Sequence, residues 1–220
     1  MVNLQKLIIY IPNNATILKR FEMLKFLKIN IIITLLIILI GCSNKVPTEK
    51  VNKLLDDYAV NLSPYKAVFV RDIANIRAKG TACGSPVGSL MPNPQLEAAA
   101  KAHAKDMAIN HMLQHDGSGT QTDPARKAEG IGSNFMDRLK FFGYPLKAHD
   151  LVGETVAHTK NRNVKSKDLK AHFKKALDTI LNDPNHCKIF MNSRFKDIGI
   201  GAYKSKDGYY WAFEYGEVEN

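Results

Sequence analysis

The sequence lacks the features that mark several common classes of protein. Its longest apolar block, at residues 29–41, is about a dozen residues long, and a membrane-spanning helix needs ~20. The sequence has neither the HExxH motif of zincin metalloproteases nor the GxSxG motif of many serine hydrolases, and GSG at Gly117–Gly119 is better explained as a loop. It has no internal repeat and no basic patch interleaved with aromatic residues, so we expect no nucleic-acid partner.

The apolar block has the length of a signal-peptide core. Lys25 and Lys28 precede it with positive charge, and it ends in LIGC at Leu39–Cys42, which matches a lipobox. In that motif the small residue before the cysteine gives the signal peptidase access, and the cysteine carries the lipid. We therefore predict that residues 1–41 are a signal peptide and that the mature protein is lipid-anchored through Cys42.

Two further residues bear on export. Met23 begins a signal of ordinary length, whereas residues 1–22 carry a second apolar stretch broken by Pro12, so Met23 is the favoured natural start. Ser43 stands where an aspartate would argue for inner-membrane retention. We expect a cell-envelope location, on the periplasmic face or the cell surface, and the outer membrane rather than the inner one in a Gram-negative cell.

The charge balance is basic. The full chain has a formal net charge of +10, and removing residues 1–42 leaves 26 basic and 20 acidic residues, a net charge of +6. A basic exported domain can associate with anionic lipid or cell-wall polymer. We favour the simpler interpretation, a solvated lysine-rich surface.

The three cysteines divide into one lipid site and one pair. With Cys42 used by the lipid, Cys83 and Cys187 remain in an oxidising compartment, where a disulfide is expected. It would close a loop of about a hundred residues, worth ~4–5 kcal/mol in the chain-entropy model. Cys83 could act as a hydrolase nucleophile only if it were unpaired.

The mature chain is expected to hold one domain. Residues 42–64 are polar, with Pro47 and Pro64, and are predicted to be a tether. Residues 65–216 are enough for one compact domain, and residues 217–220 form a tail.

Within this domain we expect helices first and strands interleaved and late, an arrangement typical of an α/β sandwich with an antiparallel sheet. The predicted elements are a helix from Tyr65 to Ile76, a helix started by Asn93 and Pro94, a short helix capped by Ser133 and stopped by Gly143, a strand at Leu151–Ala157, a helix capped by Ser166 and ended by Pro184, and strands at Asp197–Tyr203 and Tyr209–Tyr215. The aromatic residues of the last strand (Tyr209, Tyr210, Trp211, Phe213 and Tyr215) alternate at strand spacing and are predicted to be core.

Several fragments, spread over residues 65–216, then occur in order. They are NIR (75–77), CG (83–84), LEAAAKAHAKDMA (96–108), HDGSG (115–119), DRLKFFGY (137–144), GET (153–155), NHCKIFMNSRFKDIGIGAY (185–203) and YYWAFEYG (209–216). Together they resemble the bacterial branch of the CAP superfamily (cysteine-rich secretory proteins, antigen 5 and pathogenesis-related proteins), also called SCP-like.

This resemblance implies a three-layer α-β-α sandwich with a mostly antiparallel sheet, and a cleft lined by two histidines and two glutamates. By position, His115 matches the first histidine, Glu154 the glutamate of the GET segment, and His186 the second histidine. The fourth member has no clear counterpart, because the helix at 167–182 contains no glutamate and also lacks the tryptophan of many relatives. Asp178 and Asp183 are the nearby carboxylates.

These residue types could hold a metal. Two neutral imidazoles are natural ligands for a divalent transition metal, and a nearby carboxylate can orient an imidazole or activate a bound water. A stable zinc site usually takes at least three protein ligands, so His115 and His186 imply a weak or substrate-completed site for a metal such as zinc. The alternative is a polar cleft network without a metal, and no cofactor is required.

The other candidates are weaker. We expect His103 and His111 to be partly exposed helix histidines, and His149, His158 and His172 have no partner by spacing. The acidic residues of the loop and the short helix after it (Asp123, Glu129 and Asp137) fit no calcium-loop spacing.

The favoured function is that of a non-enzymatic, envelope-anchored CAP-domain lipoprotein. Its cleft is expected to bind a ligand: a hydrophobic molecule, an envelope polymer or a host component. The alternatives are a metal-assisted hydrolase acting on peptide or cell-wall material and a purely structural envelope protein.

Overall fold

A computed structural model describes residues 60–147, 150–164 and 168–217. The predicted signal peptide, the anchor at Cys42, His149 and Ser166 lie outside these residues. In the described part no helix is both long and apolar enough to cross a membrane.

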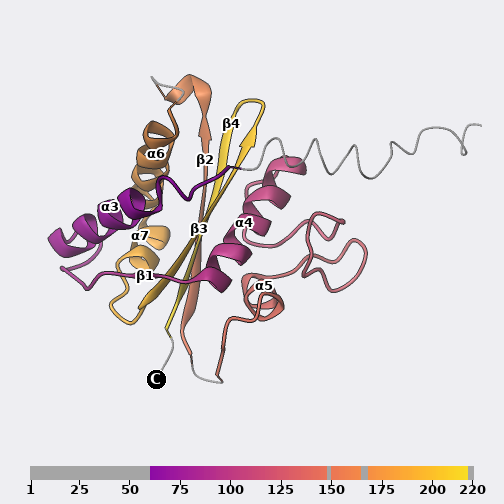
Figure 1. The fold of residues 1–220 in the computed structure, drawn as a ribbon, viewed down its shortest axis with the longest axis horizontal. Coiled ribbons are helices and arrows are strands. Elements are labelled where there is room, and N and C mark those ends of the chain that lie inside the picture. The colour runs from indigo at the N-terminus through magenta and orange to yellow at the C-terminus, as the bar shows by residue number, and fades with distance from the viewer. Residues whose placement is uncertain (1–59, 148–149, 165–167, 218–220) are drawn as a thin grey trace, which may run out of the picture. The chain divides into compact units, whose positions relative to one another are not determined.

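The described domain is a sheet between two layers of helices, as Figure 1 shows, so the predicted three-layer sandwich is confirmed. The elements in chain order are α3 (Lys66–Lys79), β1 (Met91–Pro92), α4 (Pro94–Ile109), α5 (Phe135–Phe141), β2 (Val152–Lys160), the 3₁₀ helix η1 (Asn161–Asn163), α6 (Leu169–Asn182), α7 (Pro184–Phe190), β3 (Asp197–Ser205) and β4 (Gly208–Gly216).

The strands of the sheet follow the order β1-β3-β4-β2. The strands β2, β3 and β4 are antiparallel, and the two-residue strand β1 adds a short parallel pairing, Met91 with Asp197. The sheet is therefore mostly antiparallel, as expected. In the described sheet β2 lies at one edge, and Glu154 in β2 is directly opposite Glu214 in β4.

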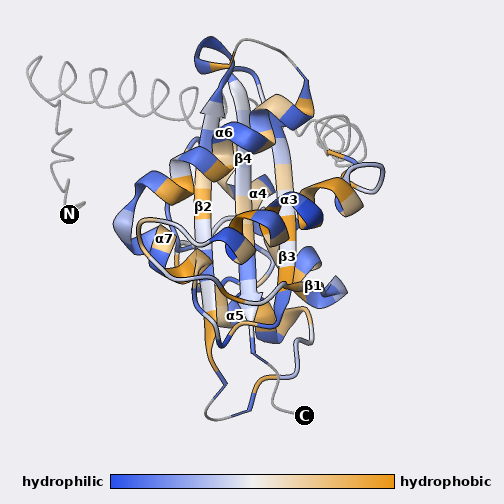
Figure 2. Cartoon of the chain, turned by 90° about the vertical axis from the view of Figure 1, so that its left-hand side faces the viewer, coloured by the Kyte–Doolittle hydropathy of each residue, from blue (hydrophilic) through white to orange (hydrophobic). Residues whose placement is uncertain are grey.

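One face of the sheet is covered by α3, α6 and α7, which lie in front of the strands in Figure 2. The buried core on this face is apolar and aromatic: Phe69 stacks on Phe173 with ring centroids 3.7 Å apart, and both contact Trp211. Trp211, Phe213 and Tyr215 of β4 belong to this core, so the prediction of a core position is confirmed for these three. Tyr209 is only partly buried against this core, and Tyr210 is buried on the opposite face.

A disulfide joins Cys83, in the loop after α3, to Cys187 in α7, with Cα atoms 6.0 Å apart. The predicted pairing is confirmed. The same two regions are also joined by Arg77, whose buried guanidinium donates to the carbonyl oxygens of Phe190 and Asn192. The position of α7 is thus fixed by a covalent bond and by hydrogen bonds.

The other face is covered by α4 and α5. Asn93 caps α4 by accepting hydrogen bonds from the backbone of Gln95 and Leu96, as its place before Pro94 predicts. The helix lies close to β3 because β3 has glycine at Gly199 and Gly201. A Cβ on Gly201 would lie 2.2 Å from the carbonyl carbon of Ala100.

Three predicted boundaries need correction. Ser133 is buried and bonds to Asp123, and the cap of α5 is Asn134, in a capping box with Asp137. The cap of α6 is Asp168. Pro184 does not only end α6: it occupies the first turn of α7, because a proline lacks the N–H that a first helical residue would leave unpaired.

Two further differences concern lengths. The strand predicted to end at Ala157 continues to Lys160. Leu62, which the sequence analysis assigns to the tether, is buried in the core beside α3, so the packed domain begins before Pro64.

Candidate functional site

The structure brings His115, Glu154 and His186 together at the β2 edge of the sheet. Nδ1 of His115 lies 2.7 Å from Oε1 of Glu154, and Nε2 of His115 lies 3.1 Å from Nε2 of His186. The histidines are 71 residues apart in sequence, so only the fold unites them. Glu154 is buried, whereas the His115 side chain is 47% exposed and that of His186 20%.

His115 sits on an irregular loop that two buried carboxylates organise. Asp106, on α4, accepts hydrogen bonds from the backbone and hydroxyl of Ser118 and from the hydroxyl of Thr122. Asp123, inside the loop, accepts from the backbone and hydroxyl of Ser133. Both carboxylates are thus satisfied by N–H and O–H donors of the loop that carries His115.

His186 is placed by a helix start. Asp183 caps α7 by accepting from the backbone N–H groups of Asn185 and His186, which puts the His186 side chain in the first turn. Asp183 therefore acts as a cap, not as the missing fourth site residue. Asp178 is exposed on α6.

Beneath His115 lies a buried cluster of charged and titratable side chains. Arg138, from α5, donates to Oε2 of Glu154 at 2.5 Å and to the backbone oxygen of His115 at 2.9 Å. Its Nε lies 3.8 Å from Oε1 of Glu214. His103, from α4, lies 3.6 Å from Oε2 of Glu154. One arginine thus connects both glutamates to the loop that carries His115.

The pKa values of the two glutamates are shifted in opposite directions. Burial acts to raise the pKa of Glu154, but three interactions outweigh it and lower that pKa below the usual range: the charge that His103 carries at the low pH where Glu154 titrates, the hydrogen bond from His115 and the charge of Arg138. Burial and the neighbouring Glu154 raise the pKa of Glu214 well above its usual range. Glu154 is therefore the carboxyl group that ionises more readily beside the single charge of Arg138, and Glu214 is the one that gains a proton more readily.

His103 is buried, so the expectation of a partly exposed helix histidine was wrong. Its Nε2 lies 2.9 Å from the carbonyl oxygen of Gln114, so this nitrogen carries the proton. Burial lowers the pKa of His103, which keeps it neutral at neutral pH. His111, by contrast, is exposed at the end of α4.

The hydrogen bond to Glu154 fixes the tautomer of His115. A carboxylate accepts only, so Nδ1 of His115 donates and the Nε2 of its neutral form carries a lone pair directed at His186. The same bond raises the pKa of His115, while burial lowers the pKa of His186. The site therefore pairs a histidine that gains a proton readily with one that resists protonation.

This geometry fits two ligands of one metal ion. Two nitrogens bound tetrahedrally to zinc at ~2.0–2.1 Å lie about 3.3 Å apart, close to the 3.1 Å between the two Nε2 atoms. Glu154 would hold the opposite nitrogen of His115, the usual arrangement for a metal-binding histidine. In the described residues no group of three or more His, Cys, Asp or Glu side chains is placed to hold a metal, so this pair would need ligands from solvent or substrate.

Sequence reasoning missed Arg138, Glu214 and the burial of His103. Glu214 gave one signal, a carboxylate within the otherwise apolar strand YYWAFEYG, where a buried acid requires a partner. Two other rejected candidates lie away from the site. Asp137 belongs to the cap of α5, and Glu129 is exposed and lies 3.9 Å from Arg126.

Comparison with known protein families identifies the family of this chain. Residues 71–215 match the family described as CAP, Cysteine-rich secretory protein family. The chain belongs to that family.

Two solved structures are similar to this chain. An outer surface protein from Borrelia burgdorferi is 17% identical, with a TM-score of 0.52 over 73% of this chain and 98% of that one, and it shows the same fold. An extracellular protein containing a SCP domain from Bacillus anthracis str. Ames is 19% identical, with a TM-score of 0.49 over 80% of this chain and 45% of that one. No curated protein matches.

Proposed function

We propose that this protein is an envelope-anchored binding protein, tethered by lipid at Cys42, whose His115–His186 pair is the contact point for its ligand. The anchor is supported by the LIGC sequence after an apolar core and by the fold shared with a protein named as an outer surface protein. A divalent transition metal such as zinc is the smallest ligand that fits the pair.

A single observation carries the binding proposal: the two Nε2 atoms lie 3.1 Å apart, while Glu154 occupies the far nitrogen of His115. Without a ligand, one imidazole must donate to the other. With a divalent metal between them, both would present lone pairs and Glu154 would stabilise the positive charge.

The position of Glu154 favours binding over hydrolysis. A general base must reach the water it activates. Oε1 of Glu154 accepts from His115 and Oε2 accepts from Arg138, and its side chain is only 1% exposed. The carboxylate therefore orients His115, which is a supporting role and not that of a base.

The binding proposal is tested by calorimetric titration with zinc of wild type, His115→Ala and His186→Ala. We expect weak binding in wild type and loss in both variants, with His111→Ala as the matched control because it removes an exposed histidine outside the site. Affinity should fall as pH decreases from about 7.5 to about 5.5, since a protonated imidazole cannot ligate and the pKa of His115 is raised. Equal affinity in wild type and both site variants would remove the pair as ligands.

The anchor is tested separately. Cys42→Ala should abolish acyl labelling and leave the precursor unprocessed. A variant that is labelled and cleaved like wild type would contradict the lipid anchor without affecting the histidine site.

A further inference from the structure

A second hollow, of about 640 Å³, lies at the far end of β2. The end of β2, η1, the β3–β4 turn and the segment after α4 form its walls. His158, on its wall, follows Glu154 by four strand residues, which is ~13 Å at 3.3 Å per residue. The hollow is therefore separate from the His115–His186 site.

The walls of this hollow are basic. Lys160, Arg162 and Lys206 line it, and Asp207 is the acidic residue among its lining side chains. No ion pair involves any of the three cations within the described residues, whereas Asp207 accepts a hydrogen bond from the hydroxyl of Ser205. Three cations and one carboxylate leave an excess of two positive charges, the charge that a phosphate dianion would neutralise.

The inner wall of the hollow carries an imidazole with an unused nitrogen. The ring of His158 stacks on Tyr210 with centroids 4.0 Å apart and an interplanar angle of 13°. Its side chain is 10% exposed, and its buried Nε2 has no hydrogen-bond partner within the described residues, although Oδ1 of Asp207 lies 3.4 Å away. Because Nε2 is buried and its nearest acceptor is Asp207, the imidazole forms the inner wall of the hollow together with Tyr210, and the three cations are the groups left to meet a ligand.

We propose that this hollow binds a phosphate group carried on a small organic molecule. Lys160, Lys206 and Arg162 neutralise the phosphate, with the guanidinium able to bond two of its oxygens. His158 and Tyr210 form the inner wall behind these cations. The hollow is large enough for a small organic molecule, so the phosphate can carry an attached group.

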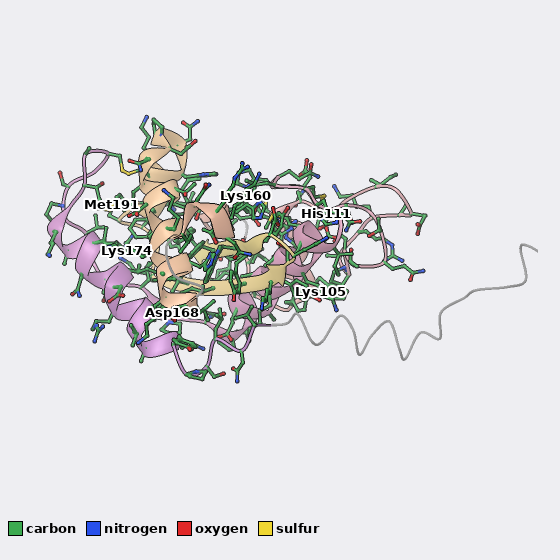
Figure 3. The ribbon with its side chains drawn as sticks, turned by 90° about the horizontal axis from the view of Figure 1, so that it is seen from above. Lys105, His111, Lys160, Asp168, Lys174 and Met191 are labelled. Atoms are coloured by element: carbon green, nitrogen blue, oxygen red, sulfur yellow. A yellow bond between two sulfur atoms is a disulfide. The ribbon has the colours of Figure 1, made fainter. Side chains whose placement is uncertain are left out.

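Lys174 provides a control residue outside the hollow. Lys160 and His111 line the hollow, whereas Lys174, on α6, lies on the other side of the molecule (Figure 3). The double variant Lys160→Glu/Lys206→Glu should bind glycerol 3-phosphate at least about tenfold more weakly than wild type, since bonds to charged groups contribute ~1.5–3 kcal/mol each. Lys174→Glu, with a charge change of the same sign, should bind like wild type. Asp207→Asn should bind more tightly, because it removes the opposing carboxylate.

The titrations are made on the full chain at low salt with glycerol 3-phosphate and with inorganic phosphate as separate probes. Tighter binding of glycerol 3-phosphate supports a phosphate ester, such as a lipid headgroup. Equal or tighter binding of inorganic phosphate would overturn the organic part of the proposal and leave a site for free phosphate. Wild-type affinity should fall as salt is added. If the double variant does not fold, exposed Arg162→Gln gives the same prediction with a smaller loss.

Two outcomes of these titrations would contradict the phosphate site. Binding of neither probe, or equal affinity in wild type, the double variant and Lys174→Glu, overturns the proposal. Zinc titration of the double variant should match wild type, so the outcome is independent of the function proposed for the histidine pair.

Discussion

The two faces of the sheet are built from different interactions. The face under α3, α6 and α7 is filled by aromatic and aliphatic side chains, with Phe69 stacked on Phe173 at its centre. The face under α4 and α5 also has small apolar residues, but around them it buries Arg138, Glu154 and His103. The first face has a disulfide beside it and the second a network of charges.

The two kinds of interaction place different demands on the side chains that make them. Apolar burial is non-directional and tolerates changes that conserve volume. A buried charge network depends on the position of every donor and acceptor, and one missing partner leaves a costly unpaired charge. The side chains that need exact placement, His115 and Glu154, lie against the second face.

Arg138→Met tests the polar face and should have the largest effect. It leaves the buried carboxylate of Glu154 without its guanidinium, so the free energy of unfolding should fall by about 3–5 kcal/mol in urea denaturation. Arg126→Met is the control: Arg126 is 31% exposed and lies 3.9 Å from the exposed Glu129, so its loss should be below ~1 kcal/mol. Similar losses in the two variants would show that the network does not stabilise this face.

The double variant Cys83→Ser/Cys187→Ser tests the apolar side. A bond closing a sequence separation of 104 residues should be worth about 2–4 kcal/mol of unfolding free energy. Zinc affinity should change little, because Arg77 still bonds the carbonyl oxygens of Phe190 and Asn192 and holds α7 beside His115. Loss of zinc binding together with stability would mean that the two faces are not separable in this way.

His172 offers the smallest and most specific test. It is fully buried on the apolar face, where its Nδ1 donates to the hydroxyl of Thr159 at 2.9 Å, and burial lowers its pKa. The unfolded chain therefore binds a proton that the folded chain does not, and stability should fall as pH drops below ~6.5, by at most ~1.4 kcal/mol per pH unit.

His172→Asn keeps a donor but cannot titrate, so its unfolding free energy should depend less steeply on pH between about 7.5 and 5.5. The exposed residue His111 provides the control, because His111→Asn should leave the slope unchanged. A slope in His172→Asn parallel to that of wild type would mean that other groups, including buried His103, account for the whole dependence.

What the sequence could predict depended on local signals. The disulfide followed from counting cysteines in an exported chain, and α4 began where Asn93 and Pro94 indicate. The start of α7 was missed because seven residues are too few to show a helical period, and Pro184 is compatible with both an end and a start. The strand β1 has two residues, one of them a proline, and leaves no pattern.

The burial of His103 could not be predicted for a different reason. Six of the sixteen residues of α4 are alanines and occur on more than one side of the helix, so composition does not indicate which side faces the sheet. Apart from the carbonyl oxygen of Gln114, the charged neighbours of His103 come from far along the chain, Glu154 on β2 and Arg138 on α5. Local periodicity carries no information about such pairs, whereas the family motifs located His115, Glu154 and His186.

The two glycines of β3 limit which sequence changes this fold can accept. Gly199 and Gly201 leave no side chain between α4 and the strand, and a Cβ on Gly199 would come within 2.0 Å of the carbonyl carbon of Leu96. Repacking of side chains cannot adjust a helix that rests directly on main chain, so α4 and His103 are held at a nearly fixed height above β3. Under the proposed binding function, a change of ligand would require changes in the loop that carries His115 and in the first turn of α7, which do not rest on these glycines.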